Sequence, residues 1–151
     1  MDESNITRVG RPYGGLAILW KNNLALSITP IKTNSSRLCA VNVKSDKINI
    51  IIFNIYMPCD NNSDESFDIF GDVLFDLLSI LDTYRGFDLI MGGDFNVDFK
   101  RNESRNLGLL KQFIDEEFLN CITLDLPNDE YTYDNNRGNK SFITILFSAK
   151  V

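Results

Sequence analysis

The sequence predicts one α+β domain over residues 1–151, and three observations lead to this prediction. The first third of the chain consists of short strand-like segments separated by turns, including an apolar run at 16–20 and an alternation of apolar and polar residues at 37–44. An amphipathic stretch at helical spacing follows at 64–84. Next comes a short apolar run that breaks into Gly92 and Gly93, which is typical of a buried strand leading into a tight bend. A chain of this length, with 44% hydrophobic residues, can bury one core.

Four strands are predicted in the first third, at 16–20, 24–29, 37–44 and 48–56. A polar turn joins the first two, and the fourth is long and strongly β-branched. Pro30 is expected to end the second strand. The short connections between these strands predict an antiparallel meander.

Two helices are predicted. The first, at 64–84, has Asn62 and Glu65 spaced as an N-cap and its partner in the first turn, and Gly86 is expected to end it. The second helix is predicted from apolar residues at helical spacing, which are Leu107, Leu110, Phe113, Ile114 and Phe118. Further strands are predicted at 121–124, 130–133 and 142–147.

Composition and charge exclude several kinds of function. The net charge is −6, with seven Lys/Arg against three Asp/Glu in residues 1–50 and eight against eighteen in residues 51–151. The acidic later part should repel a phosphate backbone unless cations intervene, although metal-dependent nucleases often have acidic sites. Histidine is absent, so this chain cannot use an imidazole as a base, an acid or a metal ligand.

The cysteines, the length of the apolar runs and the start of the chain predict the cellular compartment. Cys39, Cys59 and Cys121 are odd in number and widely spaced, which fits reduced thiols in an intracellular compartment, nuclear or cytoplasmic. No apolar run approaches the roughly 20 residues of a membrane helix, so no membrane partner is expected. The acidic, polar start of the chain is not a secretory signal or a transit peptide.

Polar residues follow the predicted central strand where its apolar run ends. Asp94 and Asn96 come directly after the two glycines, where open α/β sheets tend to place their chemistry. Tyr56 ends another predicted strand, and Thr132 and Ser141 lie in or beside two more. If these ends gather at one edge of a sheet, they combine an acid, an amide, a phenol and hydroxyls. An aspartate can deprotonate water, and an amide or phenol can bind phosphoryl oxygens, so the set suits phosphate chemistry.

Each of these residues also has a structural interpretation, which is the commoner one for a residue taken singly. Two adjacent glycines usually make a turn, and Asp94 could cap a helix or a turn. A tyrosine at a strand end, such as Tyr56, commonly has its hydroxyl in water. Thr132 in a strand needs no function. The combination in this order is what favours chemistry.

In this order the motifs resemble the endonuclease/exonuclease/phosphatase superfamily, whose fold is like that of pancreatic deoxyribonuclease. They most resemble the apurinic-type endonuclease domain that lies ahead of the reverse transcriptase in non-LTR (LINE-type) retrotransposons. The resemblance covers nearly the whole chain and implies a DNase I-like four-layer α/β/β/α sandwich, incomplete here. The matching segments are Gly-Arg-Pro-Tyr-Gly-Gly-Leu-Ala-Ile-Leu-Trp at 10–20, Ile-Tyr-Met-Pro at 55–58, Gly-Gly-Asp-Phe-Asn-Val-Asp at 92–98, Tyr-Thr-Tyr at 131–133 and Ser-Phe-Ile at 141–143.

The resemblance implies a role for each matching polar residue. Asp94 would orient or deprotonate the attacking water, and Asn96 would hold the scissile phosphate and that aspartate. Tyr56 would contact the phosphate or its metal-bound oxygens. Thr132 and Ser141 would bind the nucleic-acid strand. The implied reaction is Mg²⁺-assisted phosphodiester hydrolysis of DNA, in which the metal neutralises charge on the leaving oxygen.

The sequence also departs from the family pattern. Strands that carry an asparagine and the metal-binding glutamate should precede Gly10, yet only nine residues do, so Met1 is interpreted as an internal methionine of a longer frame. Thr144 stands where the family has two residues, one of them an aspartate. The family's final Ser-Asp-His motif would lie beyond Val151. Without the glutamate, this aspartate and the histidine, little or no nuclease activity is expected.

Three functions therefore stay open. The leading one is a truncated, catalytically impaired copy of a retrotransposon-type endonuclease domain, with DNA as a weak partner. The second is a non-catalytic module on the same fold that binds nucleic acid or a protein. The third is a phosphatase of the same superfamily that acts on a sugar or lipid phosphate. Because edge strands are missing from both ends, self-association through exposed strand edges is also expected.

Overall fold

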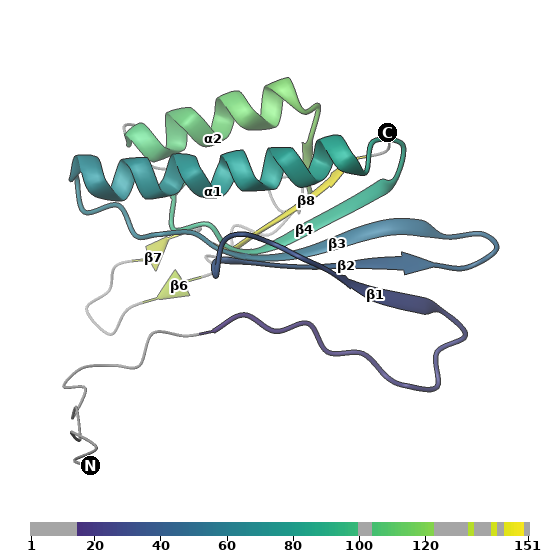
Figure 1. Cartoon of the computed structure of the whole chain (residues 1–151). Helices are drawn as coiled ribbons and strands as arrows, with labels where there is room; N and C mark the ends of the chain where they lie inside the picture. Colours follow the sequence, from purple (N-terminus) through teal and green to yellow (C-terminus); the bar gives the residue numbers. More distant parts are fainter. Residues whose placement is uncertain (1–14, 100–103, 123–132, 135–139, 142–143, 150–151) are drawn as a thin grey trace, which may run out of the picture.

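The computed structural model describes residues 15–99, 104–122, 133–134, 140–141 and 144–149. These residues form a six-stranded mixed sheet, a two-stranded sheet and two helices, so the α+β prediction is confirmed. Both helices lie on one face of the larger sheet (Figure 1), whose strand order is β1-β2-β3-β4-β8-β5. In chain order the elements are β1 (Ser27–Ile31), β2 (Leu38–Lys44), β3 (Asn49–Tyr56), α1 (Asp64–Thr83), β4 (Asp88–Asp94), α2 (Arg105–Glu116), β5 (Asn120–Cys121), β6 (Tyr133–Asp134), β7 (Lys140–Ser141) and β8 (Thr144–Ala149).

β1, β2 and β3 form the predicted antiparallel meander, and β2 and β3 agree with the predicted strands to within one residue at each end. β1 instead continues through Pro30, which pairs with Val41. The prediction that Pro30 ends this strand is therefore wrong. β1 is an edge strand, where a proline can be tolerated because one side of the strand has no ladder partner. The predicted self-association through strand edges stays a prediction.

The predicted strand at 16–20 is absent. Residues 15–20 run along the sheet face opposite the helices without forming a strand (Figure 1). The Nδ2 atom of Asn54 in β3 donates a hydrogen bond to Ala17 O at 3.0 Å, which ties this segment to the sheet. Leu19 is 92% exposed, because no described strand lies beside the segment to complete a ladder and cover it.

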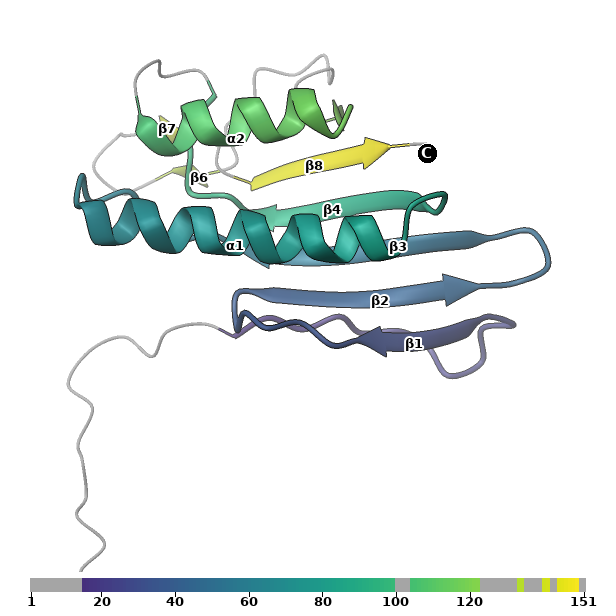
Figure 2. The same ribbon diagram turned by 45° about the horizontal axis from the view of Figure 1, so that its top comes forward.

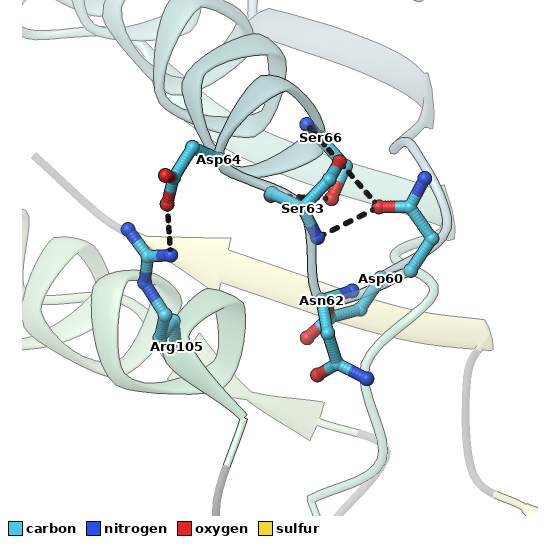
Figure 3. Close-up of polar contacts among 7 residues, drawn as sticks. Asp60, Asn62, Ser63, Asp64, Ser66 and Arg105 are labelled. Atoms are coloured by element: carbon cyan, nitrogen blue, oxygen red, sulfur yellow. Dashed lines mark hydrogen bonds and ion pairs between the residues drawn. The ribbon is translucent and has the colours of Figure 1, made fainter.

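β3, α1 and β4 form a parallel crossover unit, and α1 matches the helix predicted at 64–84. The predicted N-cap is wrong by one residue. Ser63 caps the helix, with its Oγ accepting a hydrogen bond from Ser66 N at 3.1 Å (Figure 3). Asn62 instead adopts a positive φ of 61°, which bends the chain into the cap. Gly86 follows the helix with a φ of 88°, in the left-handed conformation expected of a residue that ends a helix.

α2 lies beside α1 on the same face of the sheet (Figure 2). The Nη1 atom of Arg105 lies 2.6 Å from Asp64 Oδ1, which joins the first turns of the two helices (Figure 3). The prediction that Phe118 belongs to the apolar face of this helix is wrong. α2 ends at Glu116, and the chain then turns so that Leu119 is buried while Phe118 is 86% exposed. In the described part of the chain, no helix has the length and apolar character needed to cross a membrane.

The later strands agree in part with their predictions. β5 contains Cys121 of the strand predicted at 121–124, β6 contains Tyr133 of the one at 130–133, and β8 overlaps the one at 142–147. Residues 123–124, 130–132 and 142–143 of these predictions lie outside the described residues. None of Cys39, Cys59 and Cys121 forms a disulfide bond, which agrees with the prediction of reduced thiols.

The core lies between the two helices and one face of the sheet. The opposite face is only half-covered, since Ile50, Ile52 and Ile90 are partly exposed there. The site-bearing end of the sheet is therefore supported from one side and accessible from the other. The largest side chains buried in the core are Phe70, Phe95, Phe147, Ile51, Ile55, Met57, Leu77, Met91 and Leu110.

Gly93 lies at a point where β4 has no room for a side chain. It is the register partner of Ile55 in the parallel β3–β4 pair and has a φ of 146°. A Cβ atom at this position would lie 1.9 Å from Ile55 O and 2.7 Å from Ile55 N. Glycine therefore permits the close approach of the two strands just before Asp94.

We expect Gly93→Ala to lower the free energy of unfolding by about 3 kcal/mol or more, because the added methyl group can fit only if the backbone of β3 moves. Urea denaturation followed by circular dichroism measures this loss. Gly108→Ala is the matched control, since a Cβ at this α2 position meets nothing within 4 Å. Alanine should stabilise the helix there by about 1 kcal/mol. Equal effects of the two substitutions would contradict the packing argument.

Candidate functional site

Two of the predicted site residues meet at the ends of neighbouring strands. β3 and β4 run parallel, and their last residues, Tyr56 and Asp94, are register partners. Side chains alternate between the faces of a sheet, so this pairing places both residues on the face opposite the helices. The prediction that Tyr56 and Asp94 end two strands at one sheet edge agrees with this geometry.

The residues after β4 alternate between core and surface. Phe95 and Val97 are buried, and the Phe95 ring packs edge-on against Phe147 with 5.1 Å between ring centroids. These two apolar anchors hold the loop against the core. Asp94 and Asn96, which alternate with them, are consequently kept half-buried at the mouth of the sheet.

Asn96 supports Asp94, though not in the way that the sequence predicts. Its backbone N–H donates to Asp94 Oδ1 at 3.0 Å, while its side-chain Nδ2 donates to Met57 O at 2.8 Å. Met57 N in turn donates to Asp94 O at 2.8 Å. Asn96 adopts a φ of 50°, a left-handed conformation that asparagine tolerates well. The side-chain amide thus locks the loop to the end of β3, and one of its N–H groups is already used.

The carboxyl group of Asp94 is in a partly desolvated position. Burial raises the pKa of Asp94 above its ordinary value, and the hydrogen bond from Asn96 N partly offsets this by favouring the charged form. A raised pKa is a common property of carboxylates that act as general bases.

Tyr56 and Asp94 line a cavity of about 280 Å³ together with Asn54, Ile55 and the backbone segment at 15–16. Asn54 lies on the same sheet face, two residues before Tyr56. Sequence reasoning missed Asn54. Its signal is an amide inside the β-branched and aromatic run at 50–56, two residues before Tyr56 and therefore on the same face of the strand.

Arg37 is a second residue that the sequence did not single out. Its guanidinium carbon lies 5.5 Å from the centre of the Tyr56 ring, and its Nη1 donates to Tyr56 O at 3.3 Å. Tyr56 N donates to Arg37 O at 3.0 Å. Arg37 therefore fixes the end of β3 from the β2 side and places a positive charge next to the phenol ring.

The structure places the remaining candidates differently. Thr132 lies outside the described residues, and Ser141 is in β7, where its register partner is Tyr133. Neither prediction of nucleic-acid contact is tested. On the other side of β4, the register partner of Asp94 is Thr144 in β8. Thr144 thus occupies the ladder position next to the candidate base, where the family resemblance leads us to expect a carboxylate.

The predicted Mg²⁺ ion would need oxygen ligands. Within the described residues, no three His, Cys, Asp or Glu side chains lie close enough to hold a metal ion. Mg²⁺ commonly takes one or two carboxylates together with water and substrate phosphates, and Asp94 is the carboxylate that lines this cavity. The described residues do not form a metal site by themselves, so the Mg²⁺ requirement stays a prediction.

Comparison with known proteins identifies the fold. No family model and no curated protein sequence matches this chain. Among solved structures, the endonuclease domain of TRAS1, a telomere-specific non-LTR retrotransposon, matches with a TM-score of 0.64 and 18% identity over 82% of this chain and 54% of its own. Truncated TDP2 from Caenorhabditis elegans matches with a TM-score of 0.53 and 12% identity, over 83% of this chain and 52% of its own. An endonuclease/exonuclease/phosphatase family protein from Leptotrichia buccalis matches with a TM-score of 0.51 and 17% identity, over 82% of this chain and 49% of its own.

These similarities show that the chain has the DNase I-like fold of endonuclease/exonuclease/phosphatase proteins, which confirms the fold prediction. The TRAS1 domain is also of the retrotransposon type that the sequence motifs resemble. The chain spans about half the length of each of these structures. The similarity therefore describes a part of the fold, in line with the predicted incomplete sandwich.

The raised pKa of Asp94 predicts how this residue affects stability. A folded-state pKa above the ordinary value of 3.8 means that ionised Asp94 destabilises the native state at pH 7, and that this penalty disappears as the pH falls through the folded pKa. Asp94→Asn keeps the acceptor for Asn96 N–H and removes the charge. We expect this variant to melt at a higher temperature than the parent at pH 7, with the difference vanishing toward pH 3.

Thermal melts followed by circular dichroism between pH 3 and pH 8 measure this difference. Asp68→Asn, at an exposed position of α1, is the charge-matched control and should leave the melting temperature nearly unchanged. The argument is contradicted if Asp94→Asn melts at a lower temperature than the parent at pH 7. The hydrogen bond to the ionised carboxylate would then stabilise the folded state by more than the desolvation of that carboxylate destabilises it.

Proposed function

We propose that this chain is part of a retrotransposon-type endonuclease domain that hydrolyses phosphodiester bonds in DNA with Mg²⁺, and that the chain alone is a weak catalyst. The observation that carries this proposal is the meeting of Tyr56 and Asp94 at adjacent strand ends around one cavity. The fold similarity to the TRAS1 endonuclease domain supports DNA as the substrate class.

Asp94 is the residue that we assign to activation of water. Its half-buried carboxylate, with its raised pKa, is a stronger base than an exposed aspartate. In the proposed step, Asp94 takes a proton from water as the water oxygen bonds to phosphorus and the bond from phosphorus to the leaving deoxyribose oxygen breaks. Tyr56 and Asn54 line the same cavity, and we assign the Tyr56 hydroxyl and the Asn54 N–H that is not donated to Ala17 O as donors to the phosphoryl oxygens.

Two observations support weak catalysis. The leaving oxygen must be protonated or have its negative charge neutralised by a cation. The chain has no histidine to supply the proton, so in the proposed step the proton comes from solvent water. The ladder position beside Asp94 carries Thr144, which cannot act as a carboxylate ligand to a metal ion. A general acid typically contributes about 100-fold or more to a rate, so its loss leaves a slow reaction.

The DNA contact is proposed to be weak as well. Residues 51–151 carry eight basic against eighteen acidic residues, which opposes capture of a phosphate backbone. Thr132 and Ser141 remain our candidates for contacts along the DNA strand. The alternative of a dedicated nucleic-acid-binding module would give a steep salt dependence, with the log of the affinity falling by about 0.9 per phosphate contacted for each unit of log salt.

Nicking of supercoiled plasmid DNA tests the proposed reaction. We expect slow nicking by the parent chain with Mg²⁺, none with EDTA, and a rate about 100-fold lower for Asp94→Asn, because this change removes the base. Asp68→Asn, which has the same loss of charge on α1, should nick at the parental rate. Parallel reactions with p-nitrophenyl phosphate, a monoester, test the phosphatase alternative.

The outcomes separate the functions left open by the sequence. Nicking that survives Asp94→Asn would place the activity outside this site. Rapid nicking that disappears in Asp94→Asn would retain the site and overturn the proposed impairment. The absence of nicking together with steep, salt-sensitive DNA binding would favour the non-catalytic module. Preferential hydrolysis of the monoester would favour the phosphatase.

A further inference from the structure

A second cavity lies at the other end of the sheet from the candidate site. It has a volume of about 320 Å³ and lies where β4 begins, under the last turns of α1 and α2. Asp88 and Leu89 at the start of β4 line it, whereas Asp94 at the end of β4 lines the candidate site. Asp88 and Asp94 are six residue steps apart along β4, a distance of about 20 Å. The two cavities are therefore separate and share no lining residue.

The inside of this cavity is apolar. Its floor is formed by Ile51, Phe53 and Leu89, which are buried side chains of β3 and β4. One wall carries two aromatic rings, Tyr84 and Phe87, which pack edge-on with 5.4 Å between centroids. A volume of this size matches the lower end of small-molecule pockets, which are mostly apolar with a few polar groups at defined positions.

The charged groups at the cavity are mainly acidic. Glu116 is exposed and Glu117 is half-buried. Asp88 lies at the start of β4, but strand alternation directs its side chain to the opposite face of the sheet. The cation that lines the cavity, Arg85, is already bound by a carboxylate, since its Nε donates to Asp82 Oδ1 at 2.9 Å. Two carboxylates, Glu116 and Glu117, therefore lie beside the apolar interior.

The hydrogen-bond partner of Glu116 agrees with a preference for cations over anions. Gln112 Nε2 donates to Glu116 Oε1 at 2.8 Å, and this neutral donor orients the Glu116 carboxylate without cancelling its charge. Lys44 Nζ lies 5.2 Å from the centre of the Phe87 ring, which shows that this ring can hold an ammonium group against its face. The charge of Lys44 offsets part of the negative charge of Glu116 and Glu117.

Phe118 supplies a further apolar surface at this cavity. It is 86% exposed and adopts a φ of 52°, an uncommon conformation for a bulky aromatic residue. The ring lines the cavity instead of joining the core. A large exposed ring next to an apolar cavity can be covered by a ligand, which would remove its apolar surface from water.

We propose that this cavity is a binding site for a small organic cation with an apolar aromatic body and one ammonium group. The body occupies the floor formed by β3 and β4 and contacts the rings of Tyr84, Phe87 and Phe118. The ammonium group lies beside Glu116 and Glu117. This site does not depend on the proposed hydrolysis of DNA, because it uses none of its residues.

Tryptamine and indole-3-propionate test the proposal as a matched pair of probes, since both carry an indole on a short chain that ends in opposite charges. Titrations of the ¹⁵N-labelled chain followed by NMR give the affinity and the location of binding together. We expect tryptamine to bind about tenfold or more tightly than indole-3-propionate at low salt, with a smaller ratio at high salt. Amide shifts should concentrate around 84–89 and 116–119 and leave 54–57 and 94–96 unchanged.

Two variants distinguish the contribution of the carboxylates to probe binding from the contribution of the apolar interior. Glu116→Gln combined with Glu117→Gln should reduce the preference for tryptamine to about threefold or less, because the local charge falls while the indole contacts remain. Leu81→Trp, which enlarges a half-buried side chain in the cavity wall, should abolish binding of both probes. Their controls are Glu65→Gln with Asp68→Asn, and Phe75→Trp, all at exposed positions of α1.

The proposal is overturned if the two probes bind equally, if neither binds, or if the shifts fall at 94–96. It is also overturned if Glu65→Gln with Asp68→Asn lowers the preference for tryptamine as much as Glu116→Gln with Glu117→Gln does. The net charge of the protein alone would then explain the preference for tryptamine. Circular dichroism shows whether each variant folds. Where a variant does not fold, the NMR titrations of the parent chain with tryptamine and indole-3-propionate still decide the proposal.

Discussion

The close approach of Gly93 to Ile55 is the constraint on which the site depends. A parallel strand pair normally ends with side chains of both strands spreading into solvent, and a residue with a Cβ at position 93 would push β4 away from β3. Glycine keeps the pair in contact through its last residues, so that Tyr56 and Asp94 end the strands as register partners. The hydrogen bonds among Met57, Asp94 and Asn96 then connect the two strand ends. Both the geometry of the loop and the desolvation of the carboxyl group follow from this contact.

The sequence predicts the parts of the fold whose signals are local. Helical spacing locates α1 and α2, and β-branched runs locate β2 and β3, because burial of one face leaves a periodic pattern. Prediction fails where a neighbouring strand decides whether a segment becomes a strand. At 16–20, a continuous apolar run has no described strand beside it. The same limit applies to the site. Asp94 follows an obvious motif, whereas Asn54 gains its position only from the pairing of β3 with β4. Pro30 is tolerated within a strand because β1 lies at an edge, which the local sequence does not reveal.

The two ends of β4 have opposite chemical character. At its start, apolar strand residues and aromatic rings form an enclosed cavity rimmed by carboxylates, on the side of the helices. At its end, glycine and short polar residues leave an accessible cavity on the other face. A single strand of seven residues thus serves two sites that share no lining residue. The helix-covered face shields the first cavity, and the half-covered face leaves the second accessible.

The position of β4 in the sheet also determines when the site can form during folding. The β1–β2–β3 meander involves contacts between sequence neighbours and can form early. β4 must wait for the crossover through α1, and its other neighbour, β8, arrives only from the far end of the chain. The Tyr56–Asp94 pairing therefore belongs to the non-local contacts, which form slowly because they close long stretches of chain. During synthesis on the ribosome, the half-site on β3 is complete well before its partner strands emerge.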